Sequence, residues 1–521
     1  MSGFLLTVGV PRWGVEPAVQ QLGDAYQASL GFVNEQDHLS LYSKQQNGDL
    51  EIFEDSDRFS LVIGECFAKT NNSILSHSIP VRSTEAIRLA LERIENLRGE
   101  YLLLEIDKRF GRIRMHSDAV GGFQLFYLRK NAIFIASDSP TAIKKLAEAL
   151  RISQCGVKSD YLPRLANAYR IPPNKSIYCD IERLPGGDML SVSGRERFFT
   201  HYRYKDGSIQ SLAQGGILDL DSVAELTEAV LSQAVARSFS GETHLSLSGG
   251  ADSRLLLFGL NRCNVGPLKT VNVSFPGMKC DEQDIAAGAA SACGAFHRRV
   301  RFDTGNYWDH IEEMSKILES PPFSTLYHLW ITMQENLGAG NPYWTGGWGG
   351  DEVFIGHPIQ VFSWPARWLR SPRNLRSVWD NWRKTNTVSS IVRQAVTHHL
   401  KARPRLFQTR RKFLTKSFYP CMYTIAKARG YRMRKPLCDL DLMALMSRYS
   451  SCMILKGGTR RDLEYEVLRA LVPEQYLPPI AGKVNFDDAM EYRSGRRMAS
   501  ANDLDRLQGE INSIWAKVRG F

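Results

Sequence analysis

The sequence contains no long hydrophobic run. Its 521 residues are 43% hydrophobic, yet no apolar stretch approaches the roughly 20 residues that span a bilayer. The N-terminal GFLLTVGV lacks a basic flank and is too short for a secretory signal. These absences predict a cytoplasmic protein, and the length is too great for one core, so two domains are the simplest expectation.

Paired cysteines are missing as well. Nine cysteines occur without any CxxC spacing or histidine-rich neighbour. Neither a zinc site nor a disulfide framework is therefore expected, and the thiols should be reduced and mostly buried. They are Cys66, Cys155, Cys179, Cys263, Cys280, Cys293, Cys421, Cys438 and Cys452.

Acidic residues are almost absent from one region. Residues 359–435 contain 19 Lys and Arg against one acid, Asp380. The net charge of +11 therefore belongs to this region, and the remainder of the chain is mildly acidic. The same region contains Trp364, Trp368, Trp379 and Trp382.

The pattern of apolar residues changes at about 205–222. Up to about Ser193, short β-branched and aromatic runs end at Gly, Asn, Asp or Ser, which predicts a sheet with helices at about 84–97 and 139–150. A polar, glycine-containing span follows. Beyond it, helix-like and strand-like runs alternate, which is typical of a parallel α/β domain.

The stretch THLSLSGGADSRLLL (residues 243–257) places two glycines between a strand-like and a helix-like run. Such a turn aims backbone N–H groups and a helix N-terminus at an anion. No Walker A ending GK[ST] is present, so phosphate is not held as in common kinases. Asp252 stands where phosphate should bind, and it would fit there as a ligand of Mg²⁺.

A second stretch, YWTGGWGGDEVFIGHP (residues 343–358), repeats this arrangement and ends in Asp351 and Glu352. Two glycine loops that each deliver one aspartate could share one metal ion. Because parallel α/β sheets bind ligands beyond the carboxyl ends of their strands, both loops should face one crevice.

In this order, SGGxDS at 248–253, GGxGGDE at 346–352 and the stretch that begins PLCD at 436 resemble the asparagine synthetase superfamily of ATP pyrophosphatases. MSGFLL, RGEYLLL, HSDAVGGFQLFY and IERLPGGDML are similar to landmarks of that family's glutaminase domain. The resemblance implies an N-terminal, Ntn-type αββα sandwich over residues 1–205. It also implies a doubly wound, parallel-sheet ATP pyrophosphatase domain over 222–521, with added helices and a basic insertion at about 359–435.

The resemblance also implies site residues. ATP and Mg²⁺ are the expected cofactors, with Asp252 and Asp351 as metal ligands and Lys483 stabilising the transition state. Lys483 could instead be a surface lysine, and Glu352 could be the base for an attacking amine or could support the aspartates. The expected ATP-binding residues are Leu247, Ser248, Gly249, Gly250, Asp252, Ser253, Val273, Gly346 and Gly347.

Two departures from the family affect its glutaminase half. Glutamine-dependent members use an N-terminal cysteine, whereas the matching residue here is Ser2, whose hydroxyl is far less nucleophilic. The family also keeps an aspartate for the amino group of glutamine, and this sequence has Arg98 there. We expect a glutaminase-like domain that is catalytically inactive.

Without ammonia, the amine nucleophile must arrive on a substrate. GGDEVFIGHP resembles the corresponding run of lasso-peptide cyclases, which implies macrolactam formation in a precursor peptide. The alternatives are a β-lactam synthetase-like cyclase, which has tyrosine where Trp348 stands, and an ammonia-dependent asparagine synthetase. The alternatives from another class are a basic tRNA-binding protein and a non-catalytic scaffold.

The basic region has several interpretations. It could form solvated helices around buried tryptophans, or a docking surface for a precursor peptide, a leader peptidase, or the anionic membrane beside an export complex. Nucleic acid is a rival partner, because a strongly basic segment attracts phosphates. The glutaminase-like half and the acidic second loop favour no stable nucleic-acid complex.

Overall fold

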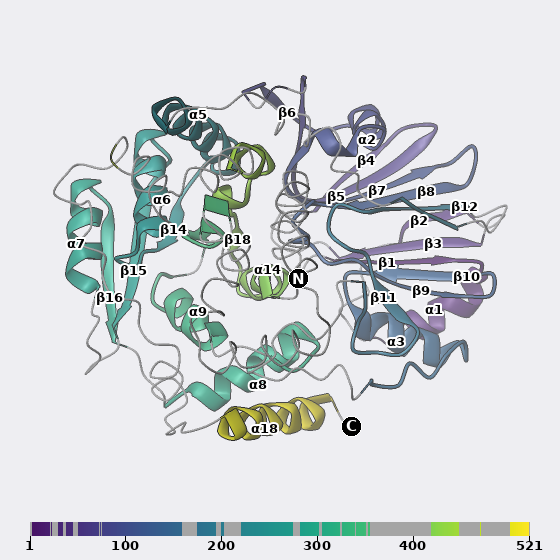
Figure 1. Ribbon diagram of the computed structural model, residues 1–521. Helices are drawn as coiled ribbons and strands as arrows, with labels where there is room; N and C mark the ends of the chain where they lie inside the picture. Colours follow the sequence, from purple (N-terminus) through teal and green to yellow (C-terminus); the bar gives the residue numbers. More distant parts are fainter. Residues whose placement is uncertain are drawn as a thin grey trace, which may run out of the picture.

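The chain folds into two halves that lie side by side (Figure 1). One half is rich in strands and the other has helices around a smaller sheet. The computed structural model describes residues 3–20, 22, 30–34, 38–44, 50–71, 73, 75–158, 174–193, 199–202, 220–274, 282–301, 305–322, 326–338, 340–350, 353–354, 418–446, 469 and 501–519.

Two antiparallel sheets form the N-terminal half. Their strand orders are β11-β9-β10-β1-β3-β2 and β13-β12-β8-β7-β5-β4, with β6 paired to β5. The first sheet consists of β1 (Gly3–Val8), β2 (Leu30–Asn34), β3 (Leu39–Lys44), β9 (Phe126–Lys130), β10 (Ile133–Ser137) and β11 (Ile181–Arg183). The second consists of β4 (Leu50–Glu54), β5 (Arg58–Lys69), β6 (Ser78–Pro80), β7 (Leu97–Asp107), β8 (Arg112–Ser117), β12 (Met189–Ser193) and β13 (Phe199–Tyr202).

Side-chain alternation along these strands produces four layers. Inward residues such as Phe4 of β1 and Leu102 of β7 share one buried cluster between the sheets. Their outward neighbours Leu5 and Leu103 pack in separate clusters with α1 and α3 on one side and with α2 on the other. Because successive strand residues point to opposite faces, this is the expected αββα sandwich. The helices are α1 (Arg12–Gln20), α2 (Thr84–Ala90) and α3 (Pro140–Ala149).

The helix expected over 84–97 is shorter than predicted. It ends at Ala90, and a 3-10 turn, η2 (Ile94–Asn96), leads directly into β7 at Leu97. Leu97 fits the helical spacing of the preceding apolar residues, but its backbone pairs with Ala68 of β5. Sheet pairing at Leu97 therefore decides where the helix must stop.

The C-terminal half is built on one parallel sheet. Its strand order is β16-β15-β14-β17-β18, and every neighbouring pair is parallel. The strands are β14 (Thr243–Ser246), β15 (Leu268–Ser274), β16 (Phe296–Arg301), β17 (Tyr343–Gly346) and β18 (Arg432–Met433). Such a sheet requires crossover helices between its strands.

Helices cover both faces of this sheet. From β14 the chain steps outward through α6 and α7 to β16, and then returns through α8 and α9 to β17 on the other side of β14. Since crossovers are right-handed, the outward and returning helices lie on opposite faces, so the doubly wound fold is confirmed. The helices are α5 (Leu220–Ser238), α6 (Ala251–Arg262), α7 (Gln283–Ala292), α8 (Tyr307–Leu318), α9 (Leu326–Glu335) and α14 (Phe418–Ala428).

The two halves share buried contacts. Ala119 of the N-terminal half belongs to the same apolar cluster as Leu256 of α6. The C-terminal helix α18 (Ala501–Arg519) packs Leu507 into this cluster and Trp515 into the cluster beneath α1 and α3. This helix therefore ties the halves together. The predicted boundary at 205–222 falls largely on residues 203–219, outside the described residues, and stays a prediction.

Two predictions from composition can be compared with the structure. All seven cysteines in the described part of the chain are free, and four of them are buried: Cys66, Cys155, Cys421 and Cys438. Across the same residues, none of the helices combines the length and apolar character needed to cross a bilayer.

His116 of β8 is a buried titratable group on the outer face of the second sheet, where it contacts Tyr101. Its Nε2 lies 3.1 Å from the Tyr101 hydroxyl and its Nδ1 lies 3.0 Å from the Asp188 carbonyl oxygen. Burial lowers the pKa of His116 to about 4. The neutral ring can donate from Nδ1 to Asp188 and accept from Tyr101, so the fold requires the uncharged form.

This requirement predicts a specific loss of stability in acid. An unfolded histidine has a pKa of about 6.5, so the contribution of His116 is complete above that pH and is lost as the pH falls toward 4. Between pH 7 and pH 5 the native protein should lose ~2 kcal/mol more unfolding free energy than His116→Gln. Urea unfolding at both pH values measures this difference; identical losses would show that His116 does not titrate in this way.

Candidate nucleotide site

The candidate site lies where the direction of the chain connections reverses. β14 and β17 are neighbours, with Ser246 opposite Gly346, but the helix after β14 and the helices before β17 cover different faces. A crevice forms beyond the carboxyl ends of two such strands. The first glycine loop (residues 247–250) follows β14, and the second glycine loop (residues 346–350) follows from β17.

The first glycine loop is closed by serine hydroxyl groups. Ser253 Oγ donates to the Ser248 carbonyl oxygen at 2.7 Å and lies 2.9 Å from Ser248 Oγ. Gly250 occupies the N-cap of α6 without a side chain. A helix start of this kind offers N–H groups and partial positive charge to an anion.

The second glycine loop packs directly on the first. A Cβ atom added at Gly347 would lie 2.7 Å from Ser253 N and 2.9 Å from Asp252 Cβ. A Cβ at Gly350 would overlap the Asp252 carboxylate, and one at Gly349, which has a φ of +93°, would overlap Cys438 Sγ. Glycine is therefore required at these positions because the two loops and their neighbours approach so closely.

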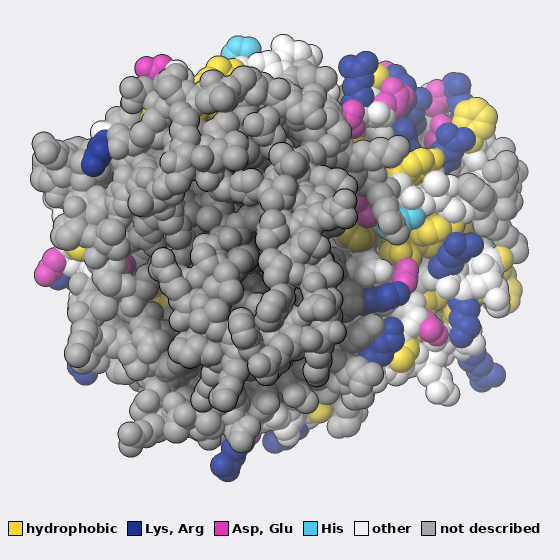
Figure 2. Space-filling view, viewed as in Figure 1, with side chains coloured by type: hydrophobic (Ala, Val, Ile, Leu, Met, Phe, Trp, Pro, Cys, Tyr) yellow, Lys and Arg dark blue, Asp and Glu magenta, His cyan; other side chains and the backbone are white. Residues whose placement is uncertain are grey.

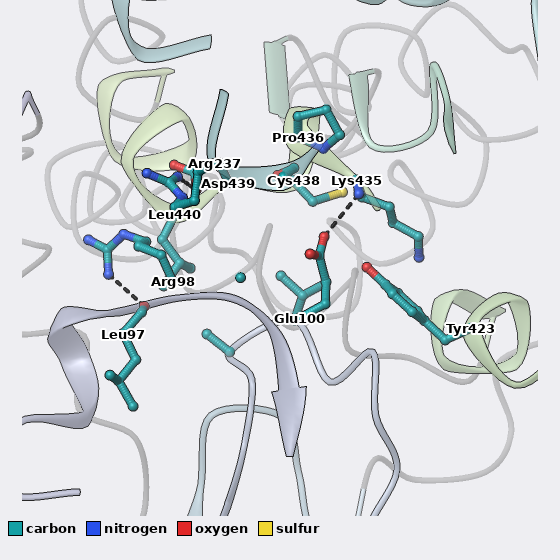
Figure 3. Close-up of a pocket in the computed structure, with 14 residues that line it drawn as sticks. Leu97, Arg98, Glu100, Arg237, Tyr423, Lys435, Pro436, Cys438, Asp439 and Leu440 are labelled. Carbon is teal, nitrogen blue, oxygen red and sulfur yellow. Dashed lines mark hydrogen bonds and ion pairs between the residues drawn. The ribbon is translucent and has the colours of Figure 1, made fainter. Parts of the chain in front are cut away.

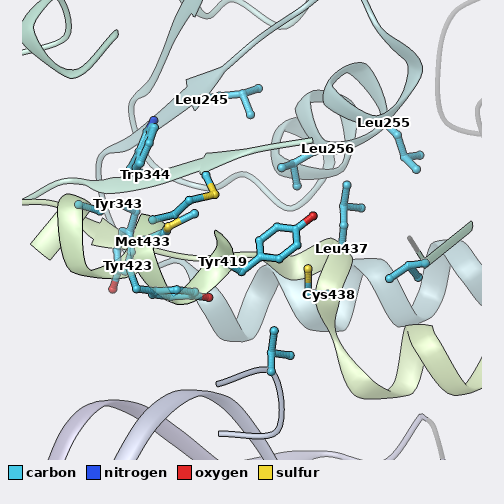
Figure 4. Close-up of a cluster of buried hydrophobic side chains, with 14 of the residues drawn as sticks. Leu245, Leu255, Leu256, Tyr343, Trp344, Tyr419, Tyr423, Met433, Leu437 and Cys438 are labelled. Atoms are coloured by element: carbon cyan, nitrogen blue, oxygen red, sulfur yellow. The ribbon is translucent and has the colours of Figure 1, made fainter. Parts of the chain in front are cut away.

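Apolar side chains support both loops from below. Trp344 of β17 is fully buried, donates from Nε1 to Ser246 Oγ at 3.0 Å, and lies 4.7 Å from the Trp348 ring centroid. Trp348 also lies 6.0 Å from the Trp330 ring centroid of α9. Figure 4 shows Trp344 in the buried apolar cluster of the C-terminal half, at the opposite end from Leu255 and Leu256 of α6. The indole rings of β17, the second glycine loop and α9 therefore pack against one another.

The structure brings the described, predicted ATP-binding residues to one edge of the sheet. Leu247 is buried, and its carbonyl oxygen accepts from Asn272 Nδ2 at 2.9 Å. The side chain of Val273 packs in a small apolar cluster with Val271 and Val300. Contacts of Leu247 and Val273 with adenine stay predictions, as does ATP binding by Ser248, Gly249, Gly250, Asp252, Ser253, Gly346 and Gly347.

Three of the predicted catalytic residues, Asp351, Glu352 and Lys483, lie outside the described residues. Among the described residues no cluster of three or more His, Cys, Asp or Glu side chains could form a metal site. Magnesium bound with nucleotide commonly uses only one or two carboxylates, with phosphate oxygens and water completing its shell. Asp252, against which Gly347 and Gly350 of the second glycine loop pack, fits that donor set.

Sequence reasoning missed three contacts that shape the loops. A Cβ at Gly249 would lie 2.5 Å from Glu282 Cβ, at the start of α7. Asn272 holds Leu247, and Cys438 packs against Gly349. Asn272 could have been noticed as an amide at the end of a predicted strand, but Cys438 is too distant in sequence to be linked to the loop.

The N-terminal half places Arg98 in an unexpected setting. Its side chain is 2% exposed and lies 2.7 Å from an oxygen of Asp441, in the C-terminal half. Lys69 Nζ lies 2.7 Å from the same oxygen. Ser2 lies outside the described residues. A cavity of about 180 Å³ beside Gly3 is lined by groups from both halves, among them Asp138 and Lys427.

A comparison with protein families matches residues 226–501 to asparagine synthase. The chain belongs to the asparagine synthase family. Members of this family join carbon to nitrogen at the expense of ATP and form AMP, so this protein is an ATP-dependent, amide-forming ligase. The family uses ATP, typically with Mg²⁺. No curated protein matches the sequence.

Three solved structures are similar to parts of the chain. The allosteric regulatory enzyme of purine biosynthesis is 9% identical over 57% of this chain and 80% of its own, with a TM-score of 0.25. The U34-tRNA thiolase NcsA from Methanococcus maripaludis is 14% identical over 61% and 79%, with a TM-score of 0.22. Glutamine phosphoribosylpyrophosphate amidotransferase from B. subtilis is 9% identical over 66% and 81%, with a TM-score of 0.24. At such TM-scores none of these likenesses supports an argument about function.

The close approach of the loops predicts the effect of adding one methyl group. Gly347→Ala must push the start of α6 away from the second glycine loop. Because overpacking typically costs about 1–3 kcal/mol, we expect the affinity for ATP to fall roughly tenfold. Gly509→Ala in α18, where a Cβ meets open space, is the control. Calorimetric titration with ATP and Mg²⁺ measures both; equal affinities would contradict the packing argument.

Proposed function

We propose that this ligase forms a macrolactam in a lasso-type precursor peptide. The side-chain carboxylate of an Asp or Glu in the peptide is adenylated by ATP, and the N-terminal amine of the peptide then forms the isopeptide bond. AMP and pyrophosphate are released. The observation that carries this proposal is the environment of Arg98, because it bears on where the amine comes from.

Arg98 stands where the resemblance places the aspartate that holds the amino group of glutamine. Its guanidinium donates to Asp441 at 2.7 and 3.0 Å and is buried. A guanidinium has no acceptor atom for an ammonium group and carries the same sign of charge. With Lys69, two cations here face the single carboxylate of Asp441. Together with Ser2 in place of the cysteine nucleophile, this supports a domain that supplies no ammonia, so the amine must belong to the substrate.

The chemistry begins with ATP on the first glycine loop. N–H groups of Ser248, Gly249 and Gly250 and the start of α6 would bind phosphate, and Asp252 with Asp351 would hold Mg²⁺. The metal, when bound, offsets phosphate charge and polarises the phosphoryl oxygens. The peptide carboxylate attacks the α-phosphorus, the bond to the β-phosphate oxygen breaks, and pyrophosphate leaves.

The resulting acyl-adenylate must meet the amine before it meets water. The amine attacks the acyl carbon, loses a proton and expels AMP. Lys483 would stabilise the negative charge that develops, and Glu352 could accept the proton.

Trp348 bears on the choice between kinds of ring closure. Its indole packs edge-to-face on Trp344 and Trp330, with interplanar angles of 71° and 73°. In β-lactam synthetase-like relatives a tyrosine is expected at this place, and an indole cannot replace a phenol as a proton carrier. This supports a peptide cyclase over a β-lactam-forming enzyme.

The partners follow from the same proposal. The precursor peptide is the substrate, and a leader peptidase and an export complex are proposed partners of the basic region 359–435. Figure 2 shows Lys and Arg mixed with acidic and apolar side chains on the N-terminal half, so that face is not uniformly basic. We also propose that the protein resides in the cytoplasm and that its basic region contacts an anionic membrane.

The test is a reaction with ATP, Mg²⁺ and a candidate peptide freed of its leader. Pyrophosphate release together with loss of one water from the peptide mass supports cyclisation. Asparagine formation from aspartate and ammonia would identify a synthetase instead, and dehydration of a small β-amino acid would identify a β-lactam-type enzyme. Strong, salt-sensitive binding of tRNA without AMP formation would favour the nucleic-acid function.

Replacing the metal-binding carboxylate should abolish the first step. Asp252→Asn keeps the side-chain volume but removes one charge, and AMP formation should fall by at least roughly a hundredfold. Asp351→Asn should behave in the same way. Asp309→Asn, which alters an acid in the first turn of α8, is the control. If Asp252→Asn forms AMP at the native rate, the assignment of Asp252 is wrong.

Glutamine should not serve as a nitrogen source, even in the native protein. We expect no glutamate release from glutamine, and Ser2→Ala should leave peptide-dependent AMP formation unchanged. Measurement of glutamate by coupled assay tests both statements. Glutamate production that disappears in Ser2→Ala would show instead that the N-terminal half is an active glutaminase.

A further inference from the structure

A short segment that follows β18 and includes the 3-10 turn η6 (Pro436–Cys438) lies between the two halves. This interface segment, residues 434–441, carries two cations at its start and two acids at its end. Three of its side chains are buried, namely Arg434, Lys435 and Asp441. Arg434 and Asp441 form ion pairs with the N-terminal half, whereas Asp439 pairs with Arg237 of α5, in the C-terminal half.

Asp441 is the most completely enclosed member. Its side chain is 3% exposed and contacts both Lys69 Nζ and Arg98 Nη2 at 2.7 Å, with Arg98 Nε at 3.0 Å. Burial by itself would raise the pKa of Asp441, but the two cations hold it below its ordinary value. Lys69 lies at the end of β5 and Arg98 lies near the start of β7.

Arg434 holds the other end of the segment. Glu65 and Glu100 stand directly opposite each other on β5 and β7, an arrangement of like charges that destabilises a sheet. Arg434 lies 3.0 Å from Glu65 and 3.9 Å from Glu100. Figure 3 shows Glu100 reaching the backbone N–H of Lys435, at 2.9 Å. The Arg434 cation and the Lys435 backbone N–H of the segment therefore offset the negative charges of Glu65 and Glu100 on the two strands.

The middle of the segment contacts the second glycine loop. Cys438 Sγ donates to the Trp348 carbonyl oxygen at 3.7 Å and fills the space that a side chain at residue 349 would need. The same loop packs on Asp252 through Gly347 and Gly350. Arg98 thus contacts the interface segment at Asp441, and three residues earlier in the same segment Cys438 contacts the second glycine loop.

We propose that Arg98 and Lys69 are positioning residues for the nucleotide site. By fixing Asp441 they fix the interface segment, and through Cys438 they set the position of the second glycine loop against Asp252. This inference rests on the proposed function only in taking the glycine loops as the ATP site. The N-terminal half then contributes to catalysis as a scaffold, through residues that never touch substrate.

The test compares Arg98→Met with Arg114→Met in the full chain. Arg114 of β8 forms an ion pair at 2.6 Å with Glu105 of β7, away from the interface segment. Its replacement therefore controls for general destabilisation. Arg98→Met should raise the Kd for ATP with Mg²⁺ about tenfold and should speed amide hydrogen exchange at residues 346–350. Arg114→Met should change neither, even if both variants unfold at a lower temperature.

Graded variants protect the test against misfolding. Arg98→Lys keeps the charge and should recover most of the ATP affinity, and Lys69→Met, which leaves the two-point contact of Arg98, should raise the Kd less than Arg98→Met. If Arg98→Met binds ATP like the native protein, or if exchange at 346–350 is unchanged, the positioning role is overturned. If the native protein itself binds no ATP, the proposed function fails instead.

Discussion

The close approach of two glycine loops is the constraint on which the rest of the site depends. Neighbouring strands in a sheet lie about 4.8 Å apart, so loops that leave β14 and β17 must either diverge or interpenetrate. Here the helices of the two strands cover opposite faces, and the loops still meet at Asp252, because Gly347 and Gly350 have no side chains. One carboxylate is thereby enclosed by backbone, next to a helix start that favours anions. Both features follow from one topological reversal in the sheet.

The ion pairs at the junction of the halves have a different physical role. Buried ion pairs gain little net stability, since desolvation offsets much of the attraction, and apolar replacements are often as stable. What they provide here is register. The interface segment presents Arg434 to Glu65 and Glu100, and Asp441 to Arg98 and Lys69. A segment displaced from these partners would leave buried charges unpaired, which is costly, so the charges favour the observed alignment.

Much of the fold could be predicted from sequence because its patterns are local. The glycine pairs, the strand-like runs before them and the aspartates after them all lie within a few residues of one another, and they gave the parallel sheet and its loops. The length of α2 could not be read this way, because pairing of Leu97 with β5 ends it. Two contacts leave no local pattern in the sequence: the packing of Cys438 against Gly349, and the ion pair of Asp441 with Arg98, which are 343 residues apart. The sequence could show that Arg98 is unsuited to binding the amino group of glutamine, but it could not show that Arg98 pairs with Asp441.

The charge at residue 98 links these arguments. An aspartate at residue 98 would meet Asp441 as a like charge in a buried site, and the repulsion would have to be relieved by protonation or by movement of the segment. Arginine at 98 turns that contact into an attraction, and a guanidinium has no acceptor atom to offer an ammonium group. The proposed inability to bind glutamine and the ion pair with the interface segment would therefore both follow from the same charge. Under the proposed function, a half that supplies no nitrogen would still act through its contacts, because the interface segment touches both Arg98 and the second glycine loop.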